Sequence, residues 1–585
     1  MRMILGVALV WSTVAHAAPA AWVKRSNEDA QLLLDVNARF QPEGASELGL
    51  EGHDEEVADL KPGFSERLQA AYKTAGDQLR QRLAVEKDPV VRQDLEILIK
   101  AANDGIRGEE LARKYDVTYI NVPELVFGGV HALLDEQISP ARRQKVVARV
   151  RRYAGLDKGY EPITKLAEDR FRERAGRAEL KGPPRAEVEK HLANTGFFID
   201  GIEQLFKQYK IADGGALAKL REELTAYQAF VQKEVLPRAR TDFRLPPEQY
   251  AFQLDQVGVD IPPAELTKKA HAAFDDLQKQ MQVLAATVAK QKGFAATDYR
   301  EVVKQLKKDQ LVGPAILPHY QQRLKDLEAI IVAQKLLTLP ARAARIRLAS
   351  EAESAQVPAP NMHPPRLVGN TGEMGEFILP LRVPAPPGAK QKTQQFDDFT
   401  FAAASWTLTA HEARPGHELQ FAAVVEKGVS IARALFAFNS TNVEGWGLYA
   451  ESIALPFMPP EGQLISLQHR MMRAARAFLD PELQMGKVTP TQARELLRHD
   501  VCLSDAMADQ EVERYTFRSP GQATAYFYGY TRLMELRADV QKAQGAKFDA
   551  TKLHDFILAQ GLLPPALLRK AVFADLVGTP PRPTN

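Results

Sequence analysis

Cysteine is nearly absent from this chain, since Cys502 is the only one among 585 residues. A single thiol forms no intrachain disulfide and no cysteine-rich zinc cluster, which excludes disulfide-stabilised scaffolds and zinc fingers. Cys502 lies near the apolar residues Leu497, Val501 and Met507. We interpret it as a core residue in a helical run rather than as a nucleophile.

An excess of charge of one sign is also missing. The formal net charge is +2, and basic and acidic residues are interleaved along the chain. Interleaved charges are typical of solvated helix faces, and this balance gives no indication of nucleic-acid binding. Internal repeats and low-complexity tracts are absent as well. A chain of this length with 45% hydrophobic residues buries a large core and is long enough for two or three domains.

Long apolar runs are missing except near the N-terminus. There, residues 3–11 are apolar, Arg2 precedes them, and Ala15-His16-Ala17 matches the A-x-A pattern of a signal-peptide cleavage site. The run is too short for a permanent membrane anchor, and no cysteine follows it as a lipoprotein would require. We predict a signal peptide at 1–17 and a periplasmic or secreted mature protein without a membrane anchor. The alternative is a buried first helix.

The strongest chemical pattern is His411-Glu412-Ala413-Arg414-Pro415-Gly416-His417. Many zinc hydrolases place two histidines four residues apart on one helix, with a glutamate general base beside the first. Here the histidines are six apart, which would turn them about 120° away from each other on a regular helix. Proline removes a helical hydrogen bond and glycine accepts unusual dihedral angles. We therefore predict a broken helix that brings His417 back to the face of His411.

A third ligand is expected in the run that begins at Glu444. Helix-capping residue types at 439–442 precede it, and Glu444 and Glu451 share one helix face because they are seven residues apart. We predict one Zn²⁺ ion bound by His411, His417 and Glu444, with Glu451 holding a ligand imidazole. Glycines at 445 and 447 indicate close approach of another backbone. The alternative for Glu444 alone is a solvated carboxylate at a helix N-terminus.

These two motifs resemble the bacterial domain-of-unknown-function family 885, whose members carry HEaxPGHHlq and EGWalYaE. That family is similar to gluzincin metallopeptidases of the thimet-oligopeptidase type. The likeness continues at 511–515 and 520–526, similar to the family's EVxRY and PGQAlaY, and more weakly at 245–266. Glu418 departs from the pattern, since the family has a second consecutive histidine there. Residues 526–529 also differ from the usual YkiG.

Apolar periodicity predicts a mainly α fold, with helices at 90–99, 217–231, 263–292 and 320–339. We divide the chain into a helical N-terminal half (18–356), a Pro/Gly-rich β-containing join (357–394) and a helical metal-binding half (395–585). The two halves are expected to enclose a cleft within one family domain. In the join, residues 375–381 are the best strand candidate. It is either a plain connector or an edge strand that pairs with an extended peptide.

The predicted chemistry follows from the motifs. Glu412 is the expected general base. Candidates for stabilising the oxyanion are Tyr526, Arg514, Tyr515 and Tyr528, with Tyr526 first because its position matches the family pattern. Core packing is the alternative for at least two of the three tyrosines, and Arg514 is also a candidate for binding a substrate carboxylate. The remaining substrate-binding candidates, all in the join, are Asn370, Gly375 and Phe377.

The function expected from these residues is an exported zinc peptidase that acts on oligopeptides. One alternative is a zinc amidase or esterase that takes a small non-peptide substrate. The other alternative is a non-catalytic peptide-binding protein. Glu412 argues against the latter, because a structural metal site has no need of a carboxylate next to its first ligand.

Overall fold

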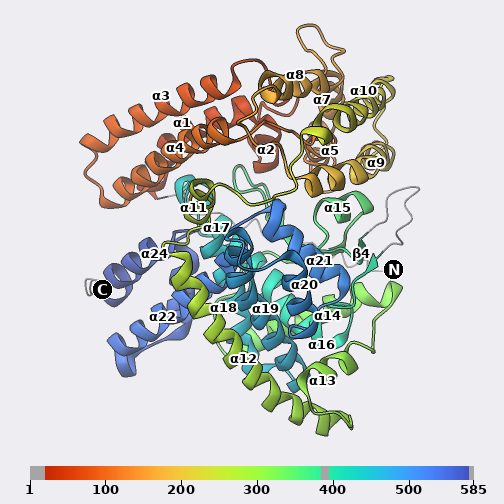
Figure 1. The fold of residues 1–585 in the computed structure, drawn as a ribbon. Helices are drawn as coiled ribbons and strands as arrows, with labels where there is room; N and C mark the ends of the chain where they lie inside the picture. The colour runs from red at the N-terminus through yellow and green to blue at the C-terminus, as the bar shows by residue number, and fades with distance from the viewer. Residues whose placement is uncertain (1–19, 384–393, 579–585) are drawn as a thin grey trace, which may run out of the picture.

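A computed structural model describes residues 20–383 and 394–578. The predicted signal peptide lies outside these residues, as does part of the predicted join. The fold is mainly α, as predicted, and its helices form two lobes (Figure 1). The N-terminal lobe contains α1 (Ala21–Phe40), α2 (Pro42–Leu48), α3 (Phe64–Val85), α4 (Pro89–Tyr115), α5 (Val122–His131), α6 (Pro140–Gln144), α7 (Val146–Tyr153), α8 (Ile163–Ala175), α9 (Arg185–Gln208), α10 (Ala216–Phe230), η1 (Val231–Val235) and η2 (Leu236–Arg238).

The C-terminal lobe contains the remaining long helices and the short turns between them. In chain order these are α11 (Pro247–Gln256), α12 (Pro263–Lys292), α13 (Tyr299–Leu306), η3 (Gly313–Ala315), α14 (Ile316–Ala333), α16 (Ala402–Leu408), η4 (Thr409–Ala413), α17 (His417–Glu426), η5 (Ala432–Phe436), α18 (Ser440–Ala454), η6 (Leu455–Phe457), α19 (Pro460–Gln484), α20 (Pro490–His499), α21 (Asp505–Glu513), η7 (Arg514–Arg518), α22 (Thr524–Gln544), η8 (Gly545–Lys547), α23 (Ala550–Ala559), α24 (Pro565–Ala571) and η9 (Val572–Val577).

Local sequence signals explain where several helices begin. The side chain of Asp88 accepts a hydrogen bond from the Val90 amide at the start of α4, and Asn439 caps α18 in the same way through Asn442. Proline at the first position opens α12 as predicted. Cys502 is buried in the core, but in the turn between α20 and α21 rather than in a helix. Helix α14 ends at Ala333, earlier than the predicted end at 339.

The large core of the C-terminal lobe forms around α12 and α19, which pack along each other. Phe274 and Met281 of α12 meet Met471 and Phe478 of α19, and the Phe274 and Phe478 rings lie edge to face at 5.6 Å. Helices α13 and α14 join the same core. Tyr250 and Leu254 of α11 belong to it too, so the packing groups α11 to α14 with the C-terminal helices.

A small sheet lies at the join between the lobes. Its strands are β1 (Arg345–Leu348), β2 (Asn361–His363) and β3 (Glu376–Leu379), in the order β1-β3-β2, and helix α15 (Glu351–Gln356) follows β1. Strands β4 (Arg382–Val383) and β5 (Gln394–Gln395) form a second pair.

The predicted strand is present as β3, but the proposal of an edge strand is wrong. Strand β1 pairs with β3 in parallel and β2 pairs with it in antiparallel register. All four residues of β3 are buried, which is the pattern of a central strand. Both hydrogen-bonding edges of β3 are therefore already used, and a peptide cannot add to them.

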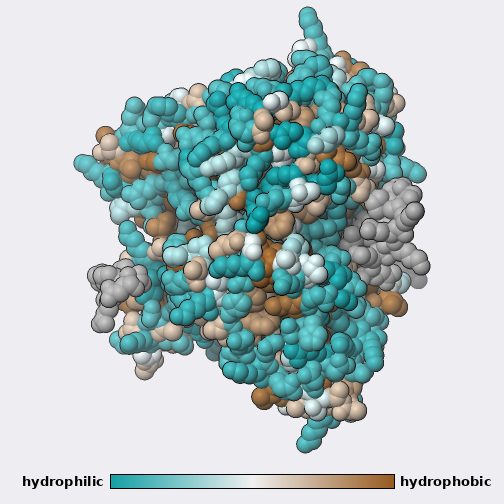
Figure 2. Space-filling model, in the orientation of Figure 1, coloured by the Kyte–Doolittle hydropathy of each residue, from teal (hydrophilic) through white to brown (hydrophobic). Residues whose placement is uncertain are grey.

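The surface agrees with the interleaved charges of the sequence. Figure 2 shows one face that is mostly hydrophilic, with hydrophobic residues in small separate groups. Among the described residues, no helix has both the length and the apolar character needed to cross a bilayer.

Candidate metal centre

The predicted break between the two histidines is present. Helix α16 continues into the π-helical turn η4, which carries His411 and Glu412, and the helical pattern then stops until His417 begins α17. A Cβ atom on Gly416 would lie 1.8 Å from the carbonyl oxygen of His411, so the tight return of the chain requires glycine there. Trp446 of α18 donates a hydrogen bond to the Pro415 carbonyl at 3.0 Å and fixes the break against the next helix.

The break brings the two imidazoles together beside Glu444. The His411 and His417 rings lie 4.6 Å apart at an interplanar angle of 80°. Oε2 of Glu444 lies 3.4 Å from Nε2 of His411 and 3.3 Å from Nε2 of His417. One ligand atom from each residue lies within 4.8 Å of the other two. We call these three residues the ligand triad.

The triad fits a zinc ion by its donor chemistry and its spacing. Oε2 of Glu444 is buried and has no hydrogen-bond partner among the described residues, although both histidines face it. A tetrahedral zinc ion with bonds of about 2.0–2.1 Å separates its ligand atoms by about 3.3–3.4 Å. The observed separations agree with that value, and two imidazoles with one carboxylate form a common set of ligands for catalytic zinc.

The residues around His411 set its orientation. Oε1 of Glu451 lies 2.7 Å from Nδ1 of His411, and Thr407 donates a hydrogen bond to the other oxygen of Glu451. This contact assigns the proton to Nδ1 and leaves the lone pair of Nε2 for a metal. On the opposite side, a Cβ atom at Gly447 would lie 2.6 Å from the ring. Gly447 thus makes room for an imidazole, whereas Gly445 packs against the backbone of Gly529, as predicted for close backbone approach.

Glu412 lies next to the first ligand and points into a cavity with it. Its carboxylate is buried, and none of the described residues donates a hydrogen bond to it. Burial raises the pKa of Glu412 above its ordinary value, although His411 and His417 oppose the rise. The cavity has a volume of about 60 Å³ and is also lined by His411, Arg473 and Tyr526.

Comparison with known proteins gives a family for the chain. The family model described as bacterial protein of unknown function, DUF885, matches residues 42–572. The chain belongs to the DUF885 family. No curated protein matches it.

Two solved structures share the fold of this DUF885 chain. One, from Colwellia psychrerythraea and described as a candidate lipoprotein, has a TM-score of 0.75 at 17% identity and covers 95% of this chain and 99% of its own. The other is a candidate lipoprotein of unknown function from Shewanella oneidensis. It has a TM-score of 0.66 at 18% identity, and the match covers 95% of this chain and 100% of the Shewanella chain. At these identities the likeness concerns the fold alone.

The DUF885 departure at Glu418 has a structural explanation. Its side chain is fully buried and lies 2.6 Å from Nε of Arg414, which also contacts Glu328 at 2.7 Å. Glu418 therefore neutralises Arg414 within the break rather than joining the ligand triad.

Two of the predicted oxyanion candidates lie at the centre. The Tyr526 ring is stacked nearly parallel to His411, with centroids 6.3 Å apart and an angle of 14°. Its hydroxyl accepts a hydrogen bond from Nη1 of Arg514 at 3.0 Å. Arg514 also donates to Gln522, whose amide lies 3.5 Å from Oε1 of Glu444.

The other two tyrosines are engaged elsewhere. Tyr515 is fully buried, donates to Glu511 at 2.7 Å and does not line the cavity beside His411. Tyr528 is also buried and donates to Asp260. Core packing, the alternative that the sequence left open for two of the three tyrosines, describes both of these residues.

The substrate-binding candidates from the join do not line the cavity beside His411. Phe377 is fully buried on β3 and packs edge to face on Tyr320. Asn370 holds a turn by donating to the carbonyls of Arg366 and Glu373. Gly375 lies against the Glu418 side chain. The residues near β2 that do line this cavity are Ala359 and Pro360.

Sequence reasoning missed the contribution of α19. His469, Arg473, Arg476 and Asp480 are all buried on this helix, and the first three line the cavity beside His411. Their spacing of three and four residues places them on one helix face. An ionisable stripe on a helix otherwise rich in Ala, Leu and Met was the signal that could have found them.

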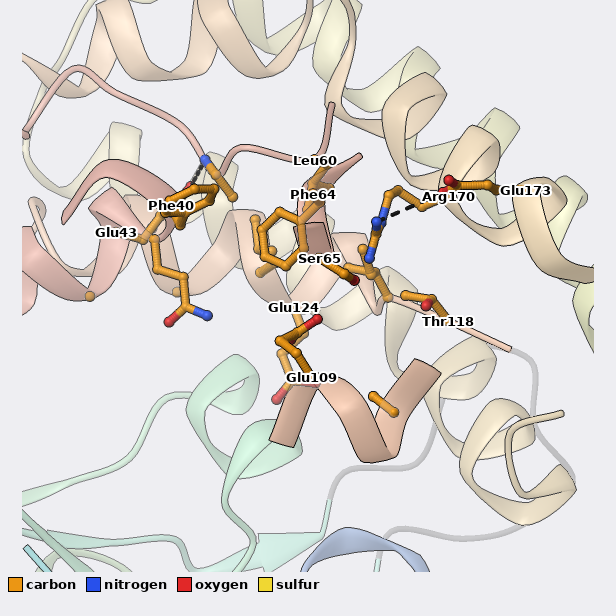
Figure 3. Close-up of a pocket in the computed structure, with 18 of the residues that line it drawn as sticks. Phe40, Glu43, Leu60, Phe64, Ser65, Glu109, Thr118, Glu124, Arg170 and Glu173 are labelled. Atoms are coloured by element: carbon orange, nitrogen blue, oxygen red, sulfur yellow. Dashed lines mark hydrogen bonds and ion pairs between the residues drawn. The ribbon is translucent and has the colours of Figure 1, made fainter. Parts of the chain in front are cut away.

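A larger cavity lies away from the triad. It measures about 660 Å³ in the N-terminal lobe, where Figure 3 shows Phe64 and Ser65 between Glu43 on one side and Arg170 on the other. A cavity of about 300 Å³ lies between α5 and the β2–β3 connection, where the lobes meet. Neither is lined by a residue of the triad.

Proposed function

We propose that this protein is an exported zinc-dependent hydrolase that cleaves peptide bonds in oligopeptides. The observation that carries the proposal is Glu412, a buried carboxylate that shares a cavity with the first residue of the triad and receives no hydrogen bond from any residue that the structure describes. A purely structural metal site has no use for such a group. A zinc hydrolase requires one as its base.

The ligand triad would hold the metal through Nε2 of each histidine and Oε2 of Glu444. A zinc ion bound there supplies a Lewis acid and lowers the pKa of water towards neutrality. Glu451 keeps the His411 ring in the orientation that this requires, because its carboxylate holds the Nδ1 proton.

Glu412 would move the proton of the reaction. Its carboxylate takes a proton from the attacking water and delivers it to the nitrogen of the leaving amine. Burial favours this role, because a raised pKa makes the carboxylate a stronger base than an exposed glutamate. The absence of a competing hydrogen bond leaves both oxygens free to turn towards the water.

Tyr526 would stabilise the charge that develops on the carbonyl oxygen. A tyrosine hydroxyl has one proton to donate, and Arg514 already satisfies one of its lone pairs. The hydroxyl proton of Tyr526 has no acceptor among the described residues, so it remains available for the substrate oxygen. Arg514 polarises the hydroxyl and strengthens it as a donor.

Export rests on the A-x-A pattern after the first apolar run and on the description of both structural neighbours as candidate lipoproteins. Fractionation of cells that express the full chain tests it. Recovery of uncleaved protein in the cytoplasm would contradict export and would leave the metal chemistry unaffected.

Metal analysis and peptide digestion together test the enzyme. Purified protein should contain about one zinc per chain and should cleave peptides in a mixed digest followed by mass spectrometry. The Glu412→Gln variant is the matched control, since it should keep the metal and lose cleavage. Turnover of small esters or amides without any peptide cleavage would favour the alternative amidase or esterase.

A further inference from the structure

Three arginines converge on Tyr526 in the cavity beside His411. The guanidinium carbons of Arg473, Arg476 and Arg514 lie 5.8, 4.4 and 5.8 Å from the centre of the Tyr526 ring. All four residues line the cavity that also contains His411 and Glu412. We call this group of three arginines and one tyrosine the arginine pocket.

The carboxylates nearby do not balance the arginine pocket. Arg476 has a full partner, because Glu511 accepts from its Nε and Nη2 at 2.7 and 2.6 Å. Arg514 donates only to the neutral oxygens of Gln522 and Tyr526, and none of the described carboxylates lies within ion-pair distance of it. One guanidinium nitrogen of Arg476, Nη1, is buried without a partner.

Arg473 is the least satisfied of the three. Its nearest carboxylate oxygen belongs to Glu451, lies 3.9 Å away and is already held by His411. Within the described parts of the chain, its Nε is buried without a hydrogen-bond partner, and its Nη1 donates only to the His469 carbonyl of the same helix. Burial lowers the pKa of Arg473, although Glu451 opposes the fall. An uncompensated buried charge disfavours folding, and such costs are found where a ligand supplies the missing partner.

We propose that the arginine pocket binds a carboxylate of the substrate, and that this carboxylate is the free C-terminus of a peptide. Guanidinium forks match a carboxylate in geometry and charge. The pocket lies in the same small cavity as His411 and Glu412, about 60 Å³ in volume, so a carboxylate bound there would be close to the bond that is cleaved. The protein would then remove short C-terminal pieces from oligopeptides.

This inference rests on the proposed function, because it names the substrate end that the same centre would select.

Three versions of one N-acetylated oligopeptide test it: the free acid, the C-terminal amide, and the amide with glutamate as last residue. The free acid should be cleaved with a kcat/KM roughly 30- to 1,000-fold above that of the plain amide, since loss of one partner leaves a buried charge unpaired. Equal values for acid and amide would overturn the proposal. Preference for the glutamate amide over the free acid would overturn the C-terminal assignment.

Arg473→Gln separates binding from folding. It should lower the ratio of kcat/KM for the free acid to kcat/KM for the amide towards one, and keep or raise the melting temperature. Arg473→Lys should restore part of the preference, because it keeps the charge but loses the fork. Arg470→Gln, on the same helix but outside the cavity, is the matched control and should change neither substrate. A lower melting temperature with an unchanged acid-to-amide ratio would show that Arg473 serves the fold and would overturn the proposal.

A binding experiment distinguishes failure of this inference from failure of the proposed function. Calorimetric titration of Glu412→Gln protein with an N-acetyl dipeptide should show at least about tenfold tighter binding of the free acid than of its amide, a difference of about 1.4 kcal/mol. The Arg473→Gln substitution should abolish that difference. If acid binding depends on Arg473 but no peptide is cleaved by the wild type, the carboxylate site stands and the peptidase proposal fails. If the wild type cleaves peptides but acid and amide bind with equal affinity, the peptidase proposal stands and the carboxylate site fails.

Discussion

Gly447→Ala should weaken zinc binding although it adds only one methyl group. The new Cβ atom would lie 2.6 Å from Cε1 of His411 and 2.9 Å from both ring nitrogens. The ring would have to move by about 0.8 Å to reach ordinary contact at 3.4 Å. It has little freedom to do so, because Glu451 holds Nδ1 at 2.7 Å.

The size of the effect follows from how precisely a metal site must be held. Ligands function within about 0.5 Å of their productive position. Disturbing the residues that orient a ligand costs 10- to 100-fold in metal affinity, or about 1.4–2.7 kcal/mol. Helix propensity acts in the opposite direction, since alanine is about 1 kcal/mol better than glycine inside a helix. Weaker zinc binding in a protein of unchanged helix content would therefore reflect the contact with His411.

Competition of metal-free protein with a chromogenic zinc chelator measures the affinity, and circular dichroism follows helix content and melting. Gly108→Ala in α4 is the matched control, because its Cβ would meet only the Phe252 ring, at an ordinary 3.6 Å. It should leave zinc affinity unchanged. Wild-type zinc affinity in folded Gly447→Ala protein would refute the reasoning. It would mean either that the His411 ring can move away from the new methyl group without loss of zinc binding, or that His411 is not a ligand.

Further substitutions test the remaining assignments. Alanine at any residue of the ligand triad should reduce bound zinc, and full metal occupancy in one variant would remove that residue from the triad. Glu412→Gln should keep zinc and lower kcat by roughly 10²–10⁴, so unchanged turnover would exclude it as the base. Tyr526→Phe should lower kcat by roughly 10²–10³ with metal content intact; lost thermal stability with unchanged kcat would make it a core residue. Burial raises the pKa of Asp480 to about 7, above its value of about 4 in the unfolded chain. The folded protein therefore holds this proton more tightly than the unfolded chain. The stability that this difference contributes is present below about pH 4 and is lost as the pH rises through 7. In Asp480→Asn the fall in melting temperature between pH 4 and 7 should be smaller, and an identical fall would contradict the assignment.

The sequence alone determined the features that depend on neighbouring residues. Proline and glycine between His411 and His417 predicted the break, because a regular helix would have turned the second imidazole away. The seven-residue interval from Glu444 to Glu451 predicted one shared helix face, and the capping residue types at 439–442 predicted the start of that helix. Residue spacing, helix capping and the backbone angles that proline and glycine allow all act over a few residues. They can therefore be predicted from the sequence without knowledge of the fold.

Only the tertiary structure decided which distant groups meet. Tyr526 and Tyr515 lie in similar sequence contexts. In the structure the Tyr526 ring is stacked on His411, whereas the Tyr515 hydroxyl donates a hydrogen bond to Glu511. Strand β3 has the composition of any strand, and its central place depends on partners at 345–348 and 361–363. The arginines of α19 reach the centre because that helix packs beside α16 and α22. Such choices depend on how whole helices and strands pack, which the composition and periodicity of each separate segment do not specify.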